Sequence, residues 1–290
     1  MSKGTGETEK HGLLHGIWET LKTVVYALLI AGVFRTFLFQ PFWIPSGSMK
    51  DTLLVGDFLF VNKMAYGYSY ASCPSIIIPR FGVDIDAEDF CGVFKGSNNR
   101  LFGGEPERGD VVVFRHPVTG RDFIKRLIGV PGDRIQMIDG VLHINDAAVG
   151  LERVAFFTEL SEPQGPEGNW PRCTNAGGGR APEGAECLKE RFIETLPNGA
   201  RHSILNIVEQ GARSADNTGV FTVPEGQYFF LGDNRDNSSD SRVPQTAGGV
   251  GFVNYEDIVG RADRIMFSSS GRSILAFWSW RSDRYFKAIE

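Results

Sequence analysis

The sequence has no excess of basic residues. Its 35 Asp and Glu residues outnumber 30 Lys and Arg residues, which gives a formal net charge of −5. A protein that binds a phosphate backbone carries a dense basic patch, and no stretch of this chain has one. The composition therefore argues against nucleic acid as a partner.

Cysteine is also scarce, with only four residues, and none of them forms a C-x-x-C pair. We therefore expect no zinc site, no other metal and no cofactor. The even number permits two disulfides, and the simplest of three connectivities pairs Cys73 with Cys91 and Cys173 with Cys187. Unpaired buried thiols are the alternative. Disulfides would place this part of the chain in an oxidising compartment outside the cytoplasm.

Charge is absent from residues 23–34, and apolar character resumes shortly afterwards. A helix that spans a membrane needs about 20 apolar residues. A cleaved signal peptide would end in small residues, whereas bulky phenylalanines occupy that place. We predict an uncleaved transmembrane anchor over residues 23–40, after a cytoplasmic tail of residues 1–22. A removed signal peptide and a buried helix are the alternatives.

Beyond the anchor, the composition favours β-structure. Aromatic residues make up 12% of the chain and glycine 35 positions, which is typical of a turn-rich β body, and 42% hydrophobic residues support a substantial core. Asp139-Gly140 joins two alternating apolar runs, which predicts a tight hairpin with a type I′ turn. Further strands are predicted at residues 57–63, 110–115, 122–130, 204–208, 227–231 and 258–267.

These patterns predict a mainly β fold: coiled antiparallel β-sheets with a β-rich cap insertion, anchored by one N-terminal transmembrane helix. Residues 41–290 form the β-rich body. Within it, residues 66–107 are an irregular excursion that carries two cysteines, and residues 150–218 are a Gly- and Pro-rich inserted cap with a single strand.

Directly after the anchor, Pro45-Ser46-Gly47-Ser48 forms a small-residue turn that presents two hydroxyls close to a bilayer surface. Taken alone, this is an ordinary turn. A serine hydroxyl becomes a nucleophile only when a base removes its proton.

Lys125 is the candidate base, because it lies within an apolar, strand-like run. Side chains alternate on a strand, so Lys125 or its neighbour Arg126 faces inward unless the strand is exposed on both sides. Lowering the lysine pKa from about 10.4 to about 8.5 requires about 2.7 kcal/mol, which burial can supply. The alternative is a lysine whose ammonium lies in water at a sheet edge.

A third segment, Gly232–Arg242, is dense in short polar side chains and follows a hydrophobic strand. A solvated Asx-turn loop and a calcium loop are both possible interpretations. The run lacks the glutamate that an EF-hand has at its twelfth position, which argues against calcium.

Together these segments resemble bacterial signal peptidase I, also called leader peptidase. Their order, and their position behind an N-terminal anchor, agree with that family, and the resemblance covers residues 35–65, 108–145 and 226–267. The matching motifs are Ser46–Met49, Phe123–Arg126, Gly129–Asp133, Gly232–Arg242 and, more weakly, Gly251–Val253.

The resemblance implies a serine endopeptidase with a Ser/Lys dyad. Ser48 would be the nucleophile and neutral Lys125 its general base, with an acyl-enzyme on Ser48 that water hydrolyses. Ser238 would hydrogen-bond the lysine nitrogen and orient it. The Ser48 backbone N–H and the Ser46 hydroxyl would form the oxyanion hole.

The resemblance also implies a shallow pocket that admits alanine-sized side chains at the −1 and −3 positions of the substrate. Arg126 and an ion pair between Asp240 and Arg242 would support the site. The residues expected to line the pocket are Phe42, Ile44, Pro45, Met49, Leu53, Phe123 and Ile124.

By the same resemblance, the substrates are preproteins that bear signal peptides. The protein would be a single-pass protein of the bacterial inner (cytoplasmic) membrane. Its catalytic domain, residues 41–290, would lie on the periplasmic side, against the lipid bilayer and near the secretion translocon. Asp51 departs from the family pattern, which commonly has proline at that position.

Two rival interpretations remain at this stage. A histidine-based serine hydrolase would use His116, the one histidine that follows a predicted core strand. A membrane-tethered β-rich binding protein with an inactive site is the alternative from another functional class. Precursor cleavage distinguishes both from the dyad enzyme.

Overall fold

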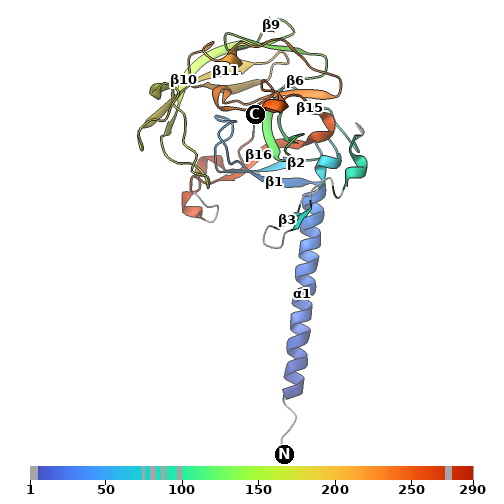
Figure 1. Cartoon of the computed structure of the whole chain (residues 1–290). Coiled ribbons are helices and arrows are strands. Elements are labelled where there is room, and N and C mark those ends of the chain that lie inside the picture. Colours follow the sequence, from blue (N-terminus) through green and yellow to red (C-terminus); the bar gives the residue numbers. More distant parts are fainter. Residues whose placement is uncertain are drawn as a thin grey trace, which may run out of the picture.

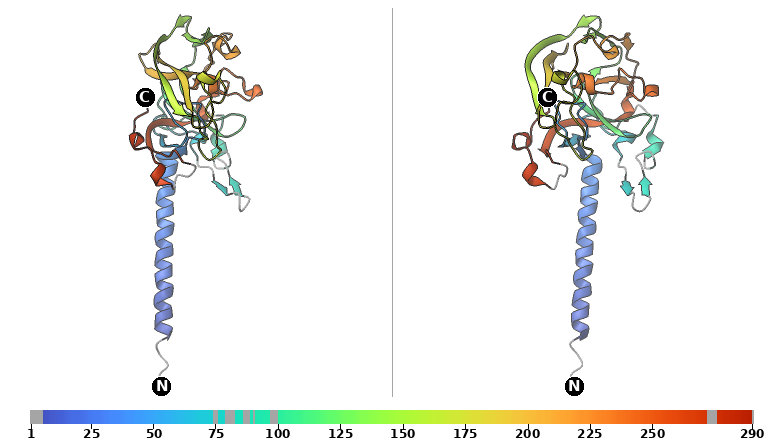
Figure 2. Two further views of the ribbon diagram at one scale, coloured as in Figure 1. Left: turned by 90° about the vertical axis from the view of Figure 1, so that its left-hand side faces the viewer. Right: turned by 60° about the vertical axis from the view of Figure 1, so that its left-hand side comes forward.

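A long N-terminal helix, α1 (Gly6–Phe37), projects from a β-rich body in the computed structural model (Figures 1 and 2). Its segment His15–Val33 is long and apolar enough to cross a membrane, and none of that segment is buried within the protein. The structure describes residues 6–73, 76–78, 83–85, 89, 91–96, 100–271 and 276–289.

The helix ends earlier than the expected anchor. It stops at Phe37, and residues 39 and 40 belong to strand β1 (Phe39–Trp43). Pro41 explains this boundary, because proline lacks a backbone N–H and disfavours helix at the preceding residue. β1 is an edge strand, where proline is tolerated.

The body is built on a curled antiparallel sheet of seven strands in the order β1-β2-β16-β5-β6-β14-β15. Register shifts interrupt β16 and the pairing of β14 with β6, and such bulges bend and twist a sheet. Besides β1, its strands are β2 (Asp57–Asn62), β5 (Val111–Arg115), β6 (Asp122–Gly129), β14 (Gln227–Leu231), β15 (Val253–Asn254) and β16 (Ile258–Ser268).

Both faces of this sheet are covered at its centre. On β5, Val111 and Val113 belong to one apolar core cluster, whereas Val112 and Phe114 belong to another. All four are buried, so β5 packs against apolar groups on either side. The adjacent strand β6 therefore lies in a part of the sheet where side chains on either face are shielded from solvent.

The predicted hairpin is confirmed. Strands β7 (Arg134–Ile138) and β8 (Val141–Ile144) pair in the expected register, and Asp139 and Gly140 have φ angles of 46° and 75°. Positive φ at both central residues defines a type I′ turn. Two short strands, β13 (Phe221–Thr222) and β9 (Ala147–Ala148), complete this four-stranded sheet.

The cap contains more β-structure than predicted. Three long strands form its sheet: β10 (Gly150–Leu160), β11 (Glu186–Thr195) and β12 (Arg201–Asn206). Only a strand near β12 was expected. On β11 the charged residues Lys189 and Glu194 are buried, so the apolar alternation that marks a half-buried strand is missing.

Two disulfides join the cysteines in neighbouring pairs, Cys73 with Cys91 and Cys173 with Cys187. The first disulfide lies within the segment of residues 66–107. This segment also carries the short strands β3 (Ile76–Ile78) and β4 (Val83–Ile85), which lie on the side of the body from which α1 projects (Figures 1 and 2). The second holds the loop between β10 and β11.

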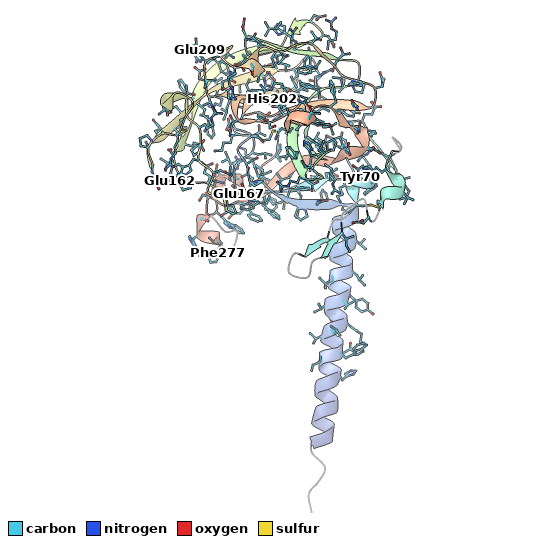
Figure 3. The ribbon with its side chains drawn as sticks, viewed as in Figure 1. Tyr70, Glu162, Glu167, His202, Glu209 and Phe277 are labelled. Atoms are coloured by element: carbon cyan, nitrogen blue, oxygen red, sulfur yellow. A yellow bond between two sulfur atoms is a disulfide. The ribbon has the colours of Figure 1, made fainter. Side chains whose placement is uncertain are left out.

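Short 3-10 helices connect many of these strands. One, Phe277–Ser279, carries Phe277 at a tip of the body on the side toward α1 (Figure 3). Phe277 and Trp278 are 70% and 78% exposed. The other 3-10 helices among the described residues are Tyr70–Ser72, Gly92–Phe94, Thr174–Ala176, Ser214–Asp216, Arg235–Asn237, Gln245–Ala247, Tyr255–Asp257 and Ser282–Arg284.

Candidate active site

The serine turn lies between β1 and β2, and backbone hydrogen bonds close it at its base. The Ile44 N–H donates to the carbonyl of Asp57 (2.9 Å), and the Gly56 N–H donates to the carbonyl of Ile44 (2.9 Å). Ser48 is buried at the inner side of this loop, whereas Ser46 stays exposed. The turn thus holds one hydroxyl inside the protein and one at its surface.

Lys125 reaches Ser48 from β6. Its Nζ lies 2.7 Å from Ser48 Oγ and 2.9 Å from the carbonyl oxygen of Ile124. The side chain is almost fully buried, and burial lowers the pKa of Lys125 to about 8, against the opposing charges of Asp240 and Asp233. The structure therefore joins residues 77 positions apart as a buried amine and a hydroxyl within hydrogen-bond reach.

Arg126 is buried as well as Lys125. The alternation of side chains on the strand required only one of these two cations to face inward. Its guanidinium donates to both carboxylate oxygens of Asp233 at 2.9 and 2.8 Å, and to Thr52 Oγ1 at 3.1 Å. The cause is the sheet position: β6 is covered on both faces, so each alternate side chain needs an internal partner.

The polar run Gly232–Arg242 packs against the serine turn and forms hydrogen bonds with its backbone. The Asn234 backbone N–H donates to the carbonyl of Ser48 (3.0 Å), and its side-chain amide donates to the carbonyl of Gly47 (2.9 Å). These bonds fix the backbone on which Ser48 Oγ is mounted. Sequence reasoning did not single out Asn234, although it lies within the polar run.

Asp240 and Arg242 form a buried ion pair with two N–H···O contacts of 2.9 Å. Burial alone would raise the pKa of Asp240, but the charge of Arg242 holds it below its usual value. Asp240 also accepts the backbone N–H of Gly232 at 3.1 Å. This pair therefore fixes the start of the polar run beside the serine turn.

Ser238 does not hydrogen-bond Lys125 in this structure, which corrects the expected contact. Its Oγ is buried but has no hydrogen-bond partner among the described residues. Ser238 nevertheless packs against the site: a Cβ added to Gly232 would lie 2.2 Å from Ser238 Oγ and 2.7 Å from the carbonyl oxygen of Ser48. Glycine at 232 is what lets these two segments approach each other.

The residues expected to line the substrate pocket divide into two groups. Ile44, Met49 and Leu53 are core residues, and Phe42 and Ile124 pack against them. Pro45 is exposed, and Phe123 packs in a different cluster against Phe114. The structure thus brings five of the seven together as one apolar group and leaves Pro45 and Phe123 outside it.

The cap contacts the residues that follow Ser48, a contribution that sequence reasoning missed. Lys50 Nζ lies 2.6 Å from a carboxylate oxygen of Glu159 on β10. Asp51 accepts from Arg191 (3.3 Å) and from the Ser203 hydroxyl (3.1 Å) on β11 and β12. The aspartate that departs from the family pattern is therefore a contact between the cap and the serine turn.

The ring of His116 is held by backbone groups and has a structural role. Its Nε2 lies 2.9 Å from the carbonyl oxygen of Gly249, and its Nδ1 accepts the backbone N–H groups of Val118 and Thr119, each at 3.2 Å. Both ring nitrogens are thus occupied by backbone groups, and the histidine-based alternative loses its base.

The acidic residues of the polar run also have separate partners. Asp233 binds Arg126, Asp240 binds Arg242, and Asp236 accepts the backbone N–H of Ile207 at 2.7 Å. No group of three or more His, Cys, Asp or Glu residues suited to a metal ion occurs in the described part of the chain. This arrangement does not support the calcium-loop interpretation.

Comparison with known proteins assigns the family. The signal peptidase, peptidase S26, family model matches residues 17–267. Signal peptidase I of Rickettsia typhi is 42% identical over 252 residues, which cover 84% of this chain and 78% of that protein. Signal peptidase I of Rickettsia prowazekii is 41% identical, over 84% of this chain and 78% of that protein.

A solved structure of a signal peptidase I from Enterococcus faecalis is 26% identical, with a TM-score of 0.28, and the match covers 55% of this chain and 97% of that one. The family match and the two curated relatives each span most of the chain, and the relatives are 42% and 41% identical to it. The chain therefore belongs to the signal peptidase family, peptidase S26, and is a serine endopeptidase.

Proposed function

We propose that this protein removes N-terminal signal peptides from exported preproteins with a Ser48/Lys125 dyad. The observation that carries the proposal is the 2.7 Å contact between Lys125 Nζ and Ser48 Oγ inside the protein. Family membership supplies the reaction class, since the relatives are named signal peptidase I.

The chemistry requires an uncharged amine. With a pKa of about 8, Lys125 is neutral in about a tenth of the molecules at pH 7 and in half of them at pH 8. The neutral amine accepts the Ser48 hydroxyl proton as Oγ attacks the scissile carbonyl carbon. The resulting ammonium then protonates the leaving amine of the mature chain, and an acyl-enzyme remains on Ser48.

Deacylation uses Lys125 as the base again. Lys125 accepts a proton from water as the water oxygen attacks the ester carbon, and the Lys125 ammonium then returns this proton to Ser48 Oγ as that oxygen leaves. In both steps, the Ser48 backbone N–H and the Ser46 hydroxyl stabilise the oxyanion. Ser46 is exposed beside the turn, so its hydroxyl is free to rotate toward a bound substrate.

We expect specificity for small residues at −1 and −3, and the apolar group near Ser48 supports this expectation. Its core members Ile44, Met49 and Leu53 are at most 3% exposed, which leaves little room for a large substrate side chain at that surface. A shallow apolar site rejects larger groups by steric exclusion.

The proposed location is the bacterial inner membrane, with residues 41–290 on the periplasmic side near the secretion translocon. Two observations support it: the apolar helix segment His15–Val33, and the two disulfides, which need an oxidising compartment. Phe277 lies on the side toward α1 (Figure 3), and both Phe277 and its neighbour Trp278 are exposed, which suits a membrane interface.

Cleavage of a signal-peptide-bearing precursor in detergent tests the proposed function. We expect the wild-type chain to cleave it, Ser48→Ala and Lys125→Met to lose at least about 10³-fold in kcat, and Ser239→Ala, an exposed serine of the same polar run, to match the wild type. Equal turnover by all four proteins contradicts the Ser48/Lys125 dyad. Absence of cleavage by the wild type contradicts the proposed function and favours a binding protein with an inactive site.

A further inference from the structure

A cavity of about 260 Å³ opens beside the serine turn and is closed on its far side by the cap. One wall is the turn itself, with Ser46, Gly47 and Ser48. Among the residues that the structure describes, the charged residues of its lining are Lys50, Arg172 and Lys189, and no carboxylate lines it. The cavity is thus cationic and reaches the nucleophile.

The positive charge of this cavity is only partly compensated. Lys50 and Lys189 both bind the same carboxylate, Glu159, so two buried ammonium groups share one negative charge. Their side chains are 4% and 1% exposed. Arg172 donates to the backbone carbonyls of Gly178 and Asp236, both at 2.9 Å, and these contacts are neutral. Three cations therefore face one carboxylate.

An uncompensated buried charge is costly, so such a cavity favours an anion that completes the pairing. Burial and the neighbouring Lys189 lower the pKa of Lys50 to about 8 despite its contact with Glu159. Lys50 also donates to Gln164 at 2.7 Å, which leaves one of its three N–H donors for a ligand. Near pH 7, Lys50 stays mostly protonated and can pair with a carboxylate.

The cavity lies apart from the apolar group near Ser48. None of Phe42, Ile44, Met49, Leu53 and Ile124 lines it, although Ser48 itself does. A peptide attacked at its scissile carbonyl extends away from the nucleophile in two directions. If residues before the scissile bond occupy the apolar group, residues after the bond point toward the cationic cavity.

We propose that this cavity is a substrate subsite for an acidic side chain, Asp or Glu, among the first residues of the mature chain after the scissile bond. Lys50, Lys189 and Arg172 bind its carboxylate through charge-assisted hydrogen bonds. The inference rests on the proposed function, and it assigns the cap a role in choosing substrates. The loop between β10 and β11, marked by Glu162 and Glu167 in Figure 3, supplies part of this subsite.

The test uses the full chain in detergent and precursor peptides that differ at one residue. Positions one, two and three after the scissile bond each carry Asp, Asn or Lys in turn. We expect kcat/KM to be about tenfold higher for Asp than for Asn at one of these positions, and lower still for Lys. Equal values for Asp, Asn and Lys at all three positions, with cleavage still dependent on Ser48, overturn the subsite and leave the proposed function intact. Absence of Ser48-dependent cleavage overturns the proposed function instead.

Variants then locate the subsite. Lys189→Gln and Arg172→Gln each remove one lining cation, and we expect the Asp-to-Asn ratio to fall toward one while the Asn peptide is still cleaved. Arg153→Gln is the matched control, because Arg153 is an exposed cap cation that does not line the cavity. An unchanged Asp-to-Asn ratio of kcat/KM in both lining variants contradicts the assignment. The comparison of Asp, Asn and Lys peptides with the wild-type protein tests the subsite even if a variant fails to fold.

Discussion

Gly232→Ala is the substitution that tests most directly how the polar run positions Ser48. An added Cβ would lie 2.2 Å from Ser238 Oγ, 2.5 Å from Ser238 Cβ and 2.7 Å from the Ser48 carbonyl oxygen. Real Cβ atoms essentially never approach heavy atoms more closely than 3.0 Å. The Ser48 contact is with the backbone, so residue 232 and the Ser48 peptide must move apart by at least about 0.3 Å, the difference between 3.0 and 2.7 Å.

Two effects follow. Overpacking at one methyl group destabilises a protein by about 1–3 kcal/mol. Displacement of the nucleophile also lowers the rate, because a 1 Å misplacement costs about 10²-fold. We therefore expect Gly232→Ala to remain folded but to lose between about tenfold and 10²-fold in kcat, with a smaller change in KM.

The assay is precursor cleavage under saturating substrate, with the melting temperature measured in parallel. Gly219→Ala is the matched control, because a Cβ at Gly219 would meet no atom within 4 Å. Wild-type kcat in Gly232→Ala would refute the argument that close approach of the polar run sets the position of Ser48. A loss of the same size in the control would show a general effect of alanine for glycine.

Three further predictions follow from the buried groups. The kcat/KM of the wild type should rise about tenfold per pH unit up to an apparent pKa of about 8, because protonation of Lys125 below this pH removes the base. The apparent pKa lies below that of a free lysine because burial favours the neutral amine. A pH profile of kcat/KM that is flat from about pH 6 to about pH 9 would contradict this prediction. Replacing Arg126 with Met leaves the Asp233 carboxylate buried without its cation, and should lower the free energy of unfolding by about 3–5 kcal/mol in denaturant titrations; a change under about 1 kcal/mol would show that the pair is dispensable. Replacing Cys173 and Cys187 together with Ser opens a loop of sequence separation 14 and should cost about 3 kcal/mol of stability, measured as a lower melting temperature of the oxidised protein, whereas an unchanged melting temperature would indicate that the bond does not form in the protein.

Local patterns were sufficient where a single physical rule acts over a few residues. The type I′ hairpin followed from Asp139-Gly140, because few other dipeptides adopt positive φ at both positions. The strands around Val111–Arg115 and Asp122–Gly129 followed from continuous apolar runs. The N-terminal apolar helix followed from uncharged composition, but it ends at Phe37 and not at residue 40, because Pro41 disfavours helix at the residue before it.

Patterns failed where burial depends on partners distant in sequence. Strand β11 buries the charged side chains of Lys189 and Glu194, and these charges are tolerated because Glu159 on β10 and Arg235 in the polar run pair with them. A periodicity argument treats such residues as exposed, so the cap appeared to contain one strand instead of three. The roles of Asn234 and Asp51 were hidden for the same reason, because both act through contacts with remote segments.

The sequence by itself determined the chemical groups: a serine on a small-residue turn, a lysine in an apolar strand and a polar run of fixed order behind an apolar helix. Only the tertiary structure decided their relation, because Ser48 and Lys125 meet across 77 residues through pairing of β5 with β6 and packing of the turn against both. It also decided which charges are paired. The cationic cavity exists because the cap sheet folds back over residues 50 and 51, an arrangement that depends on long-range contacts and leaves no periodic signal in the chain.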